Sequence, residues 1–257
     1  MAKNKLARWT ELNTFRNVIQ HQTGDVSGGD HRIKGHWNDE MFGNSNPVVL
    51  ELGCGKGEYT TGLSAIFPMK NFIGIDIKGA RMWRGAKTAN ESGTVNVAFL
   101  RTRIEFISSF FSENEVDQIL ITFPDPQPGK KNSNKRLTCP WFLNKYRIIL
   151  KDDGIVHLKT DNADLFRYTR RIAAYNGLEI LFETVDLYSA GTAEKAALTG
   201  IFLKDEKACY DNEISDSIFS IRTFYEKMFL EEGLKICYLA FRLKKDKTIR
   251  DEWERKC

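Results

Sequence analysis

The feature that most constrains the fold of this chain is a glycine turn between an apolar run and a helical pattern. Val48–Leu52 is a short apolar run, Gly53, Gly55 and Gly57 follow it, and residues 58–67 have helical spacing. Glycine suits such a turn because the backbone bends sharply and a ligand can approach without obstruction by side chains. The pattern predicts a strand, a turn and a helix, with a ligand near the turn.

The same rhythm continues along the chain. Further strands are predicted at residues 71–76, 95–100, 116–123, 154–160, 178–187 and 234–243, and helices at 79–91, 141–150, 163–176 and 221–232. Strands that alternate with helices need crossover connections, which predict an α/β fold with a mostly parallel sheet and helices on both faces. The polar stretch at 189–217 is predicted to be a loop or insertion.

We expect one domain over residues 47–243, preceded by a basic N-terminal arm (1–46) and followed by a charged C-terminal tail (244–257). Two interpretations of the first 46 residues stay open. They form either a mobile terminus or an arm whose cations contact phosphate.

Composition restricts the class of protein. The chain has 257 residues, of which 42% are hydrophobic and 28% are charged, as in an ordinary soluble globular protein. No apolar run approaches the roughly 20 residues of a membrane helix, so we expect no membrane association. The five scattered cysteines lack CxxC spacing, which indicates free thiols, a cytoplasmic location and no metal site. A net charge of +4 permits a nucleic-acid partner without requiring one.

Two acidic residues determine the chemistry expected at the turn. Asp76 ends the second strand about 20 residues after the turn, where an acid accepts hydrogen bonds from a ribose diol. Glu51 precedes the turn and would disfavour a pyrophosphate but suit a cationic group. The spacing is also GxGxG rather than the dinucleotide fingerprint GxGxxG. Together these features favour S-adenosyl-L-methionine, although a structural turn beside two unrelated acids is the alternative.

A proline-rich loop follows the fourth strand. Prolines flank Asp125 on both sides and fix the chain around it, so we expect this carboxylate to face the same cleft as the glycine turn. A basic tract comes next, and its cations suit contacts with phosphate: Lys130, Lys131, Lys135 and Arg136. A short basic run can equally be a solvated surface.

Two later motifs have a functional and a structural interpretation. Asp161 ends the fifth strand and is either a substrate-binding acid at the same sheet edge or the N-cap of the next helix. Thr223 and Glu226 have the spacing of a capping box. Nothing local identifies this pair as functional.

In order and spacing, these motifs resemble the bacterial tRNA (guanine-N7-)-methyltransferase family over residues 34–243. The residues that carry the resemblance are Glu51–Gly57, Gly74–Ile77, Phe123–Pro126 with Asn134–Arg136, Lys159–Asp161 and Thr223–Glu226. The resemblance implies a Rossmann-like S-adenosylmethionine-dependent methyltransferase fold. It also implies methyl transfer to N7 of a guanine in the variable loop of tRNA. We expect either a monomer or a homodimer.

The resemblance also implies roles for individual residues. Asp125 would be catalytic, and the cofactor would be bound by Glu51, Gly53, Gly55, Asp76, Arg103 and Asp125. The tRNA would be bound by Lys130, Lys131, Lys135, Arg136, Asp161, Thr223, Tyr225 and Glu226.

The chain departs from the family pattern at two positions. Gln127 stands where the family usually has tryptophan. Arg103 stands where an aspartate near the adenine is common, and arginine cannot accept a hydrogen bond from the adenine amino group. Two other functions remain as alternatives: an N-methyltransferase acting on an exocyclic amine, and a non-catalytic RNA-binding protein on this scaffold.

Overall fold

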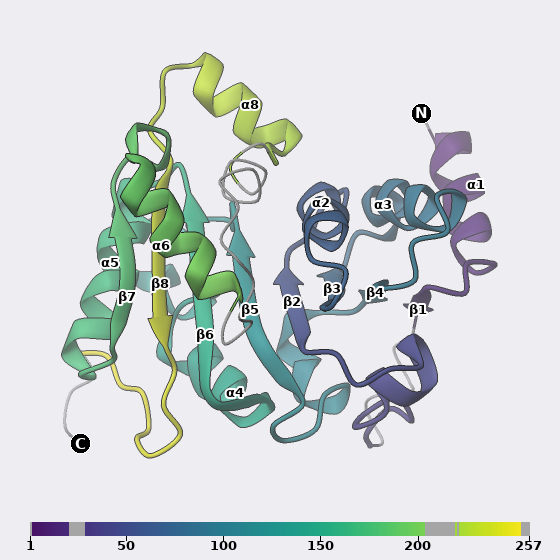
Figure 1. Ribbon diagram of the computed structural model, residues 1–257, viewed down its shortest axis with the longest axis horizontal. Helices are drawn as coiled ribbons and strands as arrows, with labels where there is room; N and C mark the ends of the chain where they lie inside the picture. The colour runs from purple at the N-terminus through teal and green to yellow at the C-terminus, as the bar shows by residue number, and fades with distance from the viewer. Residues whose placement is uncertain (1, 21–28, 204–218, 220, 253–257) are drawn as a thin grey trace.

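The computed structural model describes residues 2–20, 29–203, 219 and 221–252 (Figure 1). Eight strands of these residues form one sheet, in the order β1 (Val18–Gln20), β4 (Val97–Arg101), β3 (Asn71–Asp76), β2 (Val48–Leu52), β5 (Val116–Thr122), β6 (Leu150–Thr160), β8 (Cys237–Arg242) and β7 (Ile180–Thr184). Each neighbouring pair in the order from β1 to β6 is parallel, whereas β8 is antiparallel to both β6 and β7. This confirms the mostly parallel sheet.

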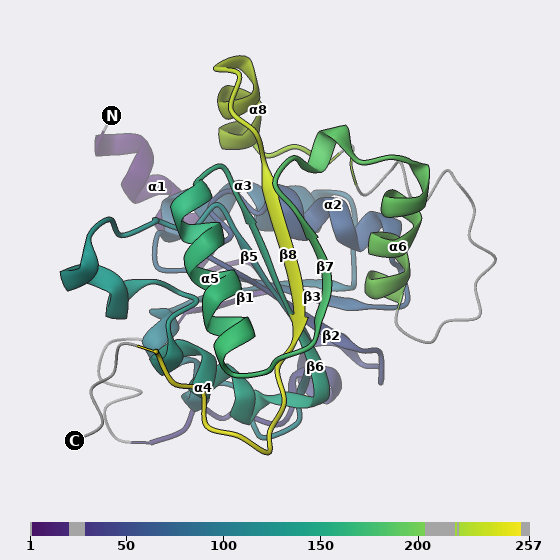
Figure 2. The ribbon, with the colours of Figure 1, turned by 90° about the vertical axis from the view of Figure 1, so that its left-hand side faces the viewer.

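Helices cover both faces of the sheet, as predicted. One face carries α1 (Ala2–Leu12), α2 (Glu58–Ile66), α3 (Gly79–Glu91) and α6 (Thr192–Leu203). The other carries α4 (Pro140–Ile149), α5 (Ala163–Tyr175) and the short helices η1 (Trp37–Phe42) and η2 (Ile104–Ser109). Figure 2 shows α5 and α6 on opposite sides of β8 and β7, with α8 (Phe224–Glu231) beyond the ends of the strands. Two more short helices are η3 (Lys130–Lys135) and η4 (Leu187–Ser189).

The central strands are apolar because both of their faces are covered. Every residue of β2 is buried. Its side chains alternate between the two layers: Leu50 packs with the α4 and α5 layer, and Val49 packs with the α2 and α3 layer. Glu51 is the one carboxylate in this strand, and its burial therefore needs a separate explanation.

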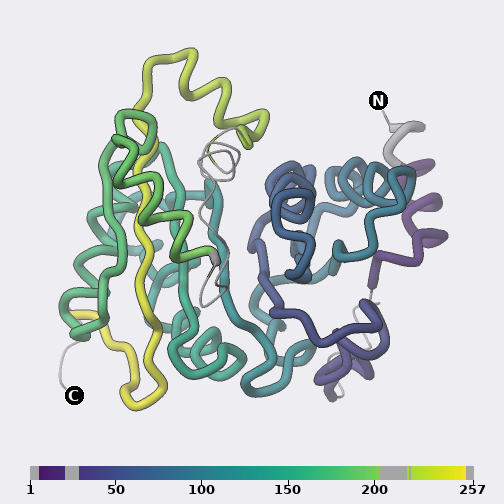
Figure 3. Tube along the Cα trace, in the orientation of Figure 1, coloured from purple at the N-terminus to yellow at the C-terminus, as the bar shows by residue number. Residues whose placement is uncertain are grey.

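The structure differs from the sequence prediction before residue 47. Residues 2–12 form α1, which packs on α3, and Glu11 accepts hydrogen bonds from Trp83 Nε1 at 2.7 Å and Lys87 Nζ at 2.8 Å. Leu12 is buried against the same layer. The next segment, β1, adds a parallel strand beside β4. Figure 3 shows α1 at one end of the long axis, with β8 toward the other. A mobile terminus is thus wrong for residues 2–20, since tertiary contacts hold this segment.

The loop predicted at 189–217 is also wrong in part. Residues 192–203 form α6, whose Leu198 and Phe202 are buried against the sheet. Residues 204–218 lie outside the described part of the chain. In the predicted tail, Ile249 is buried, and its N–H donates to Asn144 Oδ1 at 3.0 Å. Among the helices of the described residues, none has both the length and the hydropathy of a membrane span.

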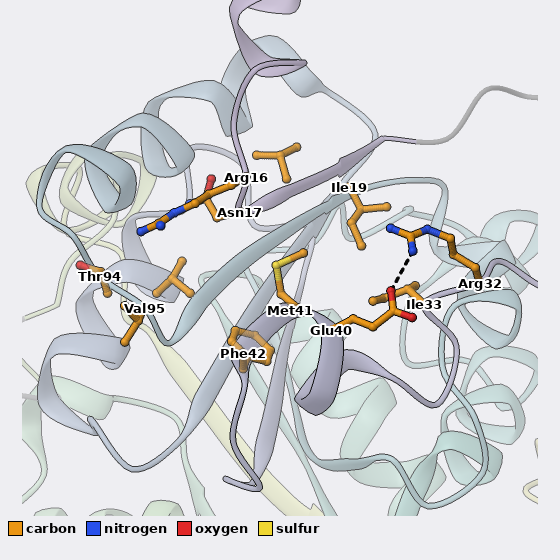
Figure 4. Close-up of a pocket in the computed structure, with 12 residues that line it drawn as sticks. Arg16, Asn17, Ile19, Arg32, Ile33, Glu40, Met41, Phe42, Thr94 and Val95 are labelled. Atoms are coloured by element: carbon orange, nitrogen blue, oxygen red, sulfur yellow. Dashed lines mark hydrogen bonds and ion pairs between the residues drawn. The ribbon is translucent and has the colours of Figure 1, made fainter.

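A cavity of about 460 Å³ lies where β1 and β4 begin (Figure 4). Ile19, Met41 and Phe42 supply apolar lining, and Arg32 Nη1 lies 3.0 Å from Glu40 Oε2 at its rim. The amino ends of parallel strands lie at the edge of the sheet opposite their carboxyl ends. This cavity is therefore separate from the acids and glycines that the sequence singles out.

Candidate active site

Five residues identified from the sequence lie after, or at the end of, adjacent parallel strands. Arg103 follows β4, Asp76 ends β3, Gly53 follows β2, Asp125 follows β5 and Asp161 follows β6. Neighbouring strands lie about 4.8 Å apart, so these residues form a row along the carboxyl edge of the sheet. The structure thus brings together residues that are distant in sequence, at the edge where ligands bind in open α/β sheets.

The glycine turn has the conformation and the open space of a ligand cradle. Gly53 and Gly55 have φ angles of 77° and 56°, in the left-handed region that favours glycine. The N–H groups of Gly53 and Cys54 donate to the Ile75 carbonyl at 2.8 and 3.0 Å, which fixes the turn on β3. A Cβ atom at Gly53 would meet no atom of the described residues within 4 Å. The space above the turn is open to a ligand.

Asp76 is oriented by the same turn. Its Oδ2 accepts from the Gly55 N–H at 2.9 Å, and its Oδ1 accepts from the Lys78 N–H at 2.7 Å. Each carboxylate oxygen has a second lone pair, so both can still accept from a diol.

Glu51 lies beneath the turn, and its side chain is held by hydroxyl and amide donors. Its Oε2 accepts from the N–H and the hydroxyl of Thr60, and its Oε1 accepts from Thr122 Oγ1 at 2.6 Å. Burial raises the pKa of Glu51 to about 7, against the opposing effect of these hydrogen bonds. A cationic group placed above the turn would favour the ionised form.

A cavity of about 480 Å³ extends from the turn toward β4. Gly53 and Asp76 line it together with apolar and polar side chains, which include Ile77, Thr102, Arg103, Ile104, Glu105, Leu137 and Phe142. The glycine turn, the Asp76 carboxylate and the apolar wall fit S-adenosylmethionine, which has an ammonium, a ribose and an adenine.

The proline loop holds Asp125 in a strained backbone. Phe123 and Gln127 have φ angles of 46° and 47°, and such left-handed residues typically cost about 1–3 kcal/mol each. The Phe123 N–H donates to the Lys159 carbonyl at 2.8 Å, and the Gln127 N–H donates to Asp125 Oδ1 at 3.1 Å. Asp125 is exposed on a loop whose shape is held from both ends, and this loop follows β5, the strand next to β2.

The basic tract divides between two cavities. Arg136 donates from Nε to the Pro126 carbonyl at 3.2 Å and lies 4.3 Å from the centre of the Tyr168 ring. Arg136 and Lys130 line a cavity of about 520 Å³, together with Arg167 and Arg171 of α5. Lys135 instead lines the cavity beside Gly53, and Lys131 is exposed. Neither α5 arginine was predicted from the sequence to be functional, although their i, i+4 spacing on a predicted helix could have indicated them.

Asp161 is half-buried, and burial raises the pKa of its carboxyl group. The N-cap of α5 is Asn162, whose side chain accepts from the Leu165 N–H at 2.9 Å. The capping alternative for Asp161 is therefore wrong, and its carboxylate lies at the sheet edge beside the proline loop.

The Thr223–Glu226 motif joins α8 to the end of β6. The capping box is confirmed, since the Glu226 N–H donates to Thr223 Oγ1 at 3.2 Å and the Thr223 N–H to Glu226 Oε2 at 3.4 Å. Glu226 is also fully buried and pairs at 2.7 Å with Lys159, a residue of the resemblance motif to which no role was assigned from the sequence. Tyr225 is 40% exposed, with the Arg81 guanidinium 5.8 Å from its ring centre. Thr223 and Glu226 thus hold α8, whereas Tyr225 is accessible.

Comparison with known proteins assigns the chain to a family. Residues 45–216 match the family described as "Putative methyltransferase". The tRNA (guanine-N(7)-)-methyltransferase of Bacteroides thetaiotaomicron is 43% identical over 98% of this chain and 90% of that protein. Those of Christiangramia forsetii (46% identical, 95% and 99% covered) and Porphyromonas gingivalis (49% identical, 90% and 86% covered) are similar.

Among solved structures, the fold is similar to that of the 16S rRNA methyltransferase KamB. The TM-score is 0.57 at 12% identity, and the match covers 83% of this chain and 95% of that one. At this level of identity the likeness establishes the methyltransferase fold alone. The much closer sequence relatives establish the rest: this chain belongs to the tRNA (guanine-N(7)-)-methyltransferase family.

Proposed function

We propose that this protein transfers the methyl group of S-adenosylmethionine to N7 of a guanine in the variable loop of tRNA. The observation that carries the proposal is the order of groups along the sheet edge. The glycine cradle at Gly53 lies next to Asp125, and the cationic cavity around Arg136 lies beyond it. The proposed partner is tRNA, bound by a monomer or a homodimer, and the proposed compartment is the cytoplasm.

The bound cofactor supplies an activated methyl group on a sulfonium, and its positive charge passes to the purine as the N7–carbon bond forms and the carbon–sulfur bond breaks. Guanine N7 has a lone pair and no proton, so the protein needs no strong base there. The role of the chain is to align the base with the methyl group, an effect worth about 7–11 kcal/mol in well-oriented reactions.

We assign Asp125 and Asp161 to the guanine. Each could accept a hydrogen bond from N1–H or the exocyclic amine of the base, and that bond strengthens as positive charge develops on the ring. Glu51 would face the cofactor ammonium, and Asp76 the ribose. Tyr225 is exposed at the same end of the molecule and supports base stacking.

The cavity of Lys130, Arg136, Arg167 and Arg171 supports binding of the RNA backbone. A guanidinium group can donate two parallel hydrogen bonds to one phosphate. Two of the four cations make cation–π contacts with Tyr168, since the guanidinium groups of Arg136 and Arg171 lie 4.3 and 5.5 Å from its ring centre. Lys131 and Lys135 would extend this surface along η3.

The test uses unmodified tRNA transcripts and methyl-labelled S-adenosylmethionine. We expect label in 7-methylguanine from a normal transcript and none from a transcript with 7-deazaguanine at the target position. The Asp125→Asn and Asp161→Asn variants should lose most of the rate, and Asp161→Asn should retain cofactor binding. Label on an exocyclic amine would support the alternative methyltransferase, and RNA binding without turnover would support a non-catalytic protein. Either result would overturn the proposal.

A further inference from the structure

The cavity beside Gly53 has an end, around Arg103, at which no residue has yet been given the role of hydrogen-bond acceptor. In the strand order β4–β3–β2, Gly53 lies beyond β2, Asp76 and Ile77 lie at the end of β3, and residues 102–105 lie beyond β4. A ligand held at Gly53 with its ribose at Asp76 therefore projects its base toward β4. Two strand spacings, roughly 10 Å, suit the extended span of such a nucleoside.

The walls at the β4 end suit a flat aromatic base. Ile77 directly follows Asp76 and is 50% exposed although it lines the cavity, so a ligand could cover it. Ile104, Leu137 and Phe142 complete the apolar lining. A base in this position would bury apolar surface that the described residues leave open to solvent, and its polar edge would meet residues 102–105.

An acidic side chain, Glu105, lies at the end of the cavity where the polar edge of the base would be. Glu105 lines the cavity, and its Oε1 accepts a hydrogen bond from Arg103 Nη2 at 2.9 Å. A carboxylate has about four lone-pair sites, so Glu105 can accept further hydrogen bonds. Although burial raises the pKa of Glu105, the Arg103 hydrogen bond and the charges of Arg103 and Lys145 lower it overall, which keeps the side chain anionic.

We propose that Glu105 accepts a hydrogen bond from the exocyclic amino group of the cofactor's adenine, and that Arg103 is the positioning residue that holds Glu105. Arg103 has only donors and cannot accept from an amine. Two residues farther along the chain, Glu105 supplies the acceptor from the same short segment. The inference rests on the proposed binding of S-adenosylmethionine and not on the RNA substrate. It therefore deepens the cofactor-binding part of the proposed function.

The test compares two ligands in calorimetric titrations of the full chain without RNA. S-adenosylhomocysteine carries the amino group, and S-inosylhomocysteine has a carbonyl oxygen in its place. The wild-type protein should prefer the adenosyl compound by about tenfold to a hundredfold, the range typical of a hydrogen bond to a charged group. In Glu105→Gln, the amide can donate to the carbonyl, so this preference should fall to within about threefold.

Glu113→Gln is the matched control, since Glu113 is an acidic side chain 70% exposed outside the cavity, and it should keep the wild-type preference. Arg103→Gln should lower the preference for the adenosyl ligand. Arg103→Lys should retain more of that preference than Arg103→Gln does, a difference that a purely structural role of Arg103 would not produce.

An unchanged preference in Glu105→Gln, or an equal loss of affinity for both ligands, would overturn the inference. Because the titrations contain no RNA, either result would leave the proposed methylation of guanine standing. Failure of the 7-deazaguanine experiment would in turn leave the role of Glu105 standing.

Discussion

Removing the carboxylate of Glu226 should leave a buried ammonium without its ion-pair partner. Lys159 Nζ and Glu226 Oε1 lie 2.7 Å apart, and the two side chains are only 2% and 0% exposed. The Tyr188 hydroxyl donates to the same oxygen at 2.6 Å. The substitution Glu226→Ala therefore deprives both groups of their acceptor at the junction between β6 and α8.

The expected cost follows from burial. Breaking a buried ion pair by removing one partner typically costs about 3–5 kcal/mol, because the remaining charge stays out of water. Replacing both partners, as in Lys159→Met with Glu226→Leu, should cost less than about 1–2 kcal/mol, since neither charge is then desolvated. The coupling energy between the two sites should therefore be large and favourable.

The cost should also depend on pH. Burial lowers the pKa of Lys159, and the Glu226 carboxylate opposes this shift. Without Glu226 the pKa should fall further, so the unfolded chain binds more protons than the folded variant below the ordinary lysine pKa. Stability then rises with pH, and the penalty of Glu226→Ala should be smaller at pH 9 than at pH 7.

Urea denaturation, followed by tryptophan fluorescence, measures these free energies for the wild type, Glu226→Ala, the single variants Lys159→Met and Glu226→Leu, and the double variant that combines the last two. Thr10→Ala, at an exposed position on α1, is a control that should change stability by less than about 0.5 kcal/mol. The reasoning is refuted if Glu226→Ala costs under 1 kcal/mol, or if the double variant loses the sum of the single losses.

Three further outcomes are expected. Because burial raises the pKa of Glu51 to about 7, affinity for S-adenosylhomocysteine should rise about tenfold from pH 6 to pH 8, and titrations of Glu51→Gln should show a flat profile. Gly57→Ala should lower the urea midpoint more than Gly53→Ala, because its new Cβ would lie 2.6 Å from Phe99 Cε1; equal midpoints would contradict this. Arg167→Glu should weaken tRNA binding and lower the salt dependence by about one phosphate contact without changing cofactor affinity, and unchanged RNA affinity in filter binding would exclude a contact there.

The core of the fold could be predicted from local patterns in the sequence. Central parallel strands are buried on both faces, so they appear as continuous apolar runs such as Val48–Leu52. The glycine turn and the Thr223–Glu226 capping box depend on backbone conformation within a few residues, and the structure confirms both. By contrast, β1 has three half-buried residues, and its pairing with β4 is a long-range contact that carries no local signal.

The sequence by itself determined the order of strands and helices from β2 to β7, the glycine turn and the acids that end the strands, because each depends on neighbouring residues; α1, β1 and α6 were not predicted. Only the tertiary structure decided which side chains meet across the chain. Lys159 and Glu226 are distant in sequence, yet they form one buried pair. Likewise, the Arg103–Glu105 pair lines the same cavity as Gly53 and Asp76 only because β4 lies beside β3. Such contacts depend on where the sheet places the ends of its strands, which no pattern of neighbouring residues encodes.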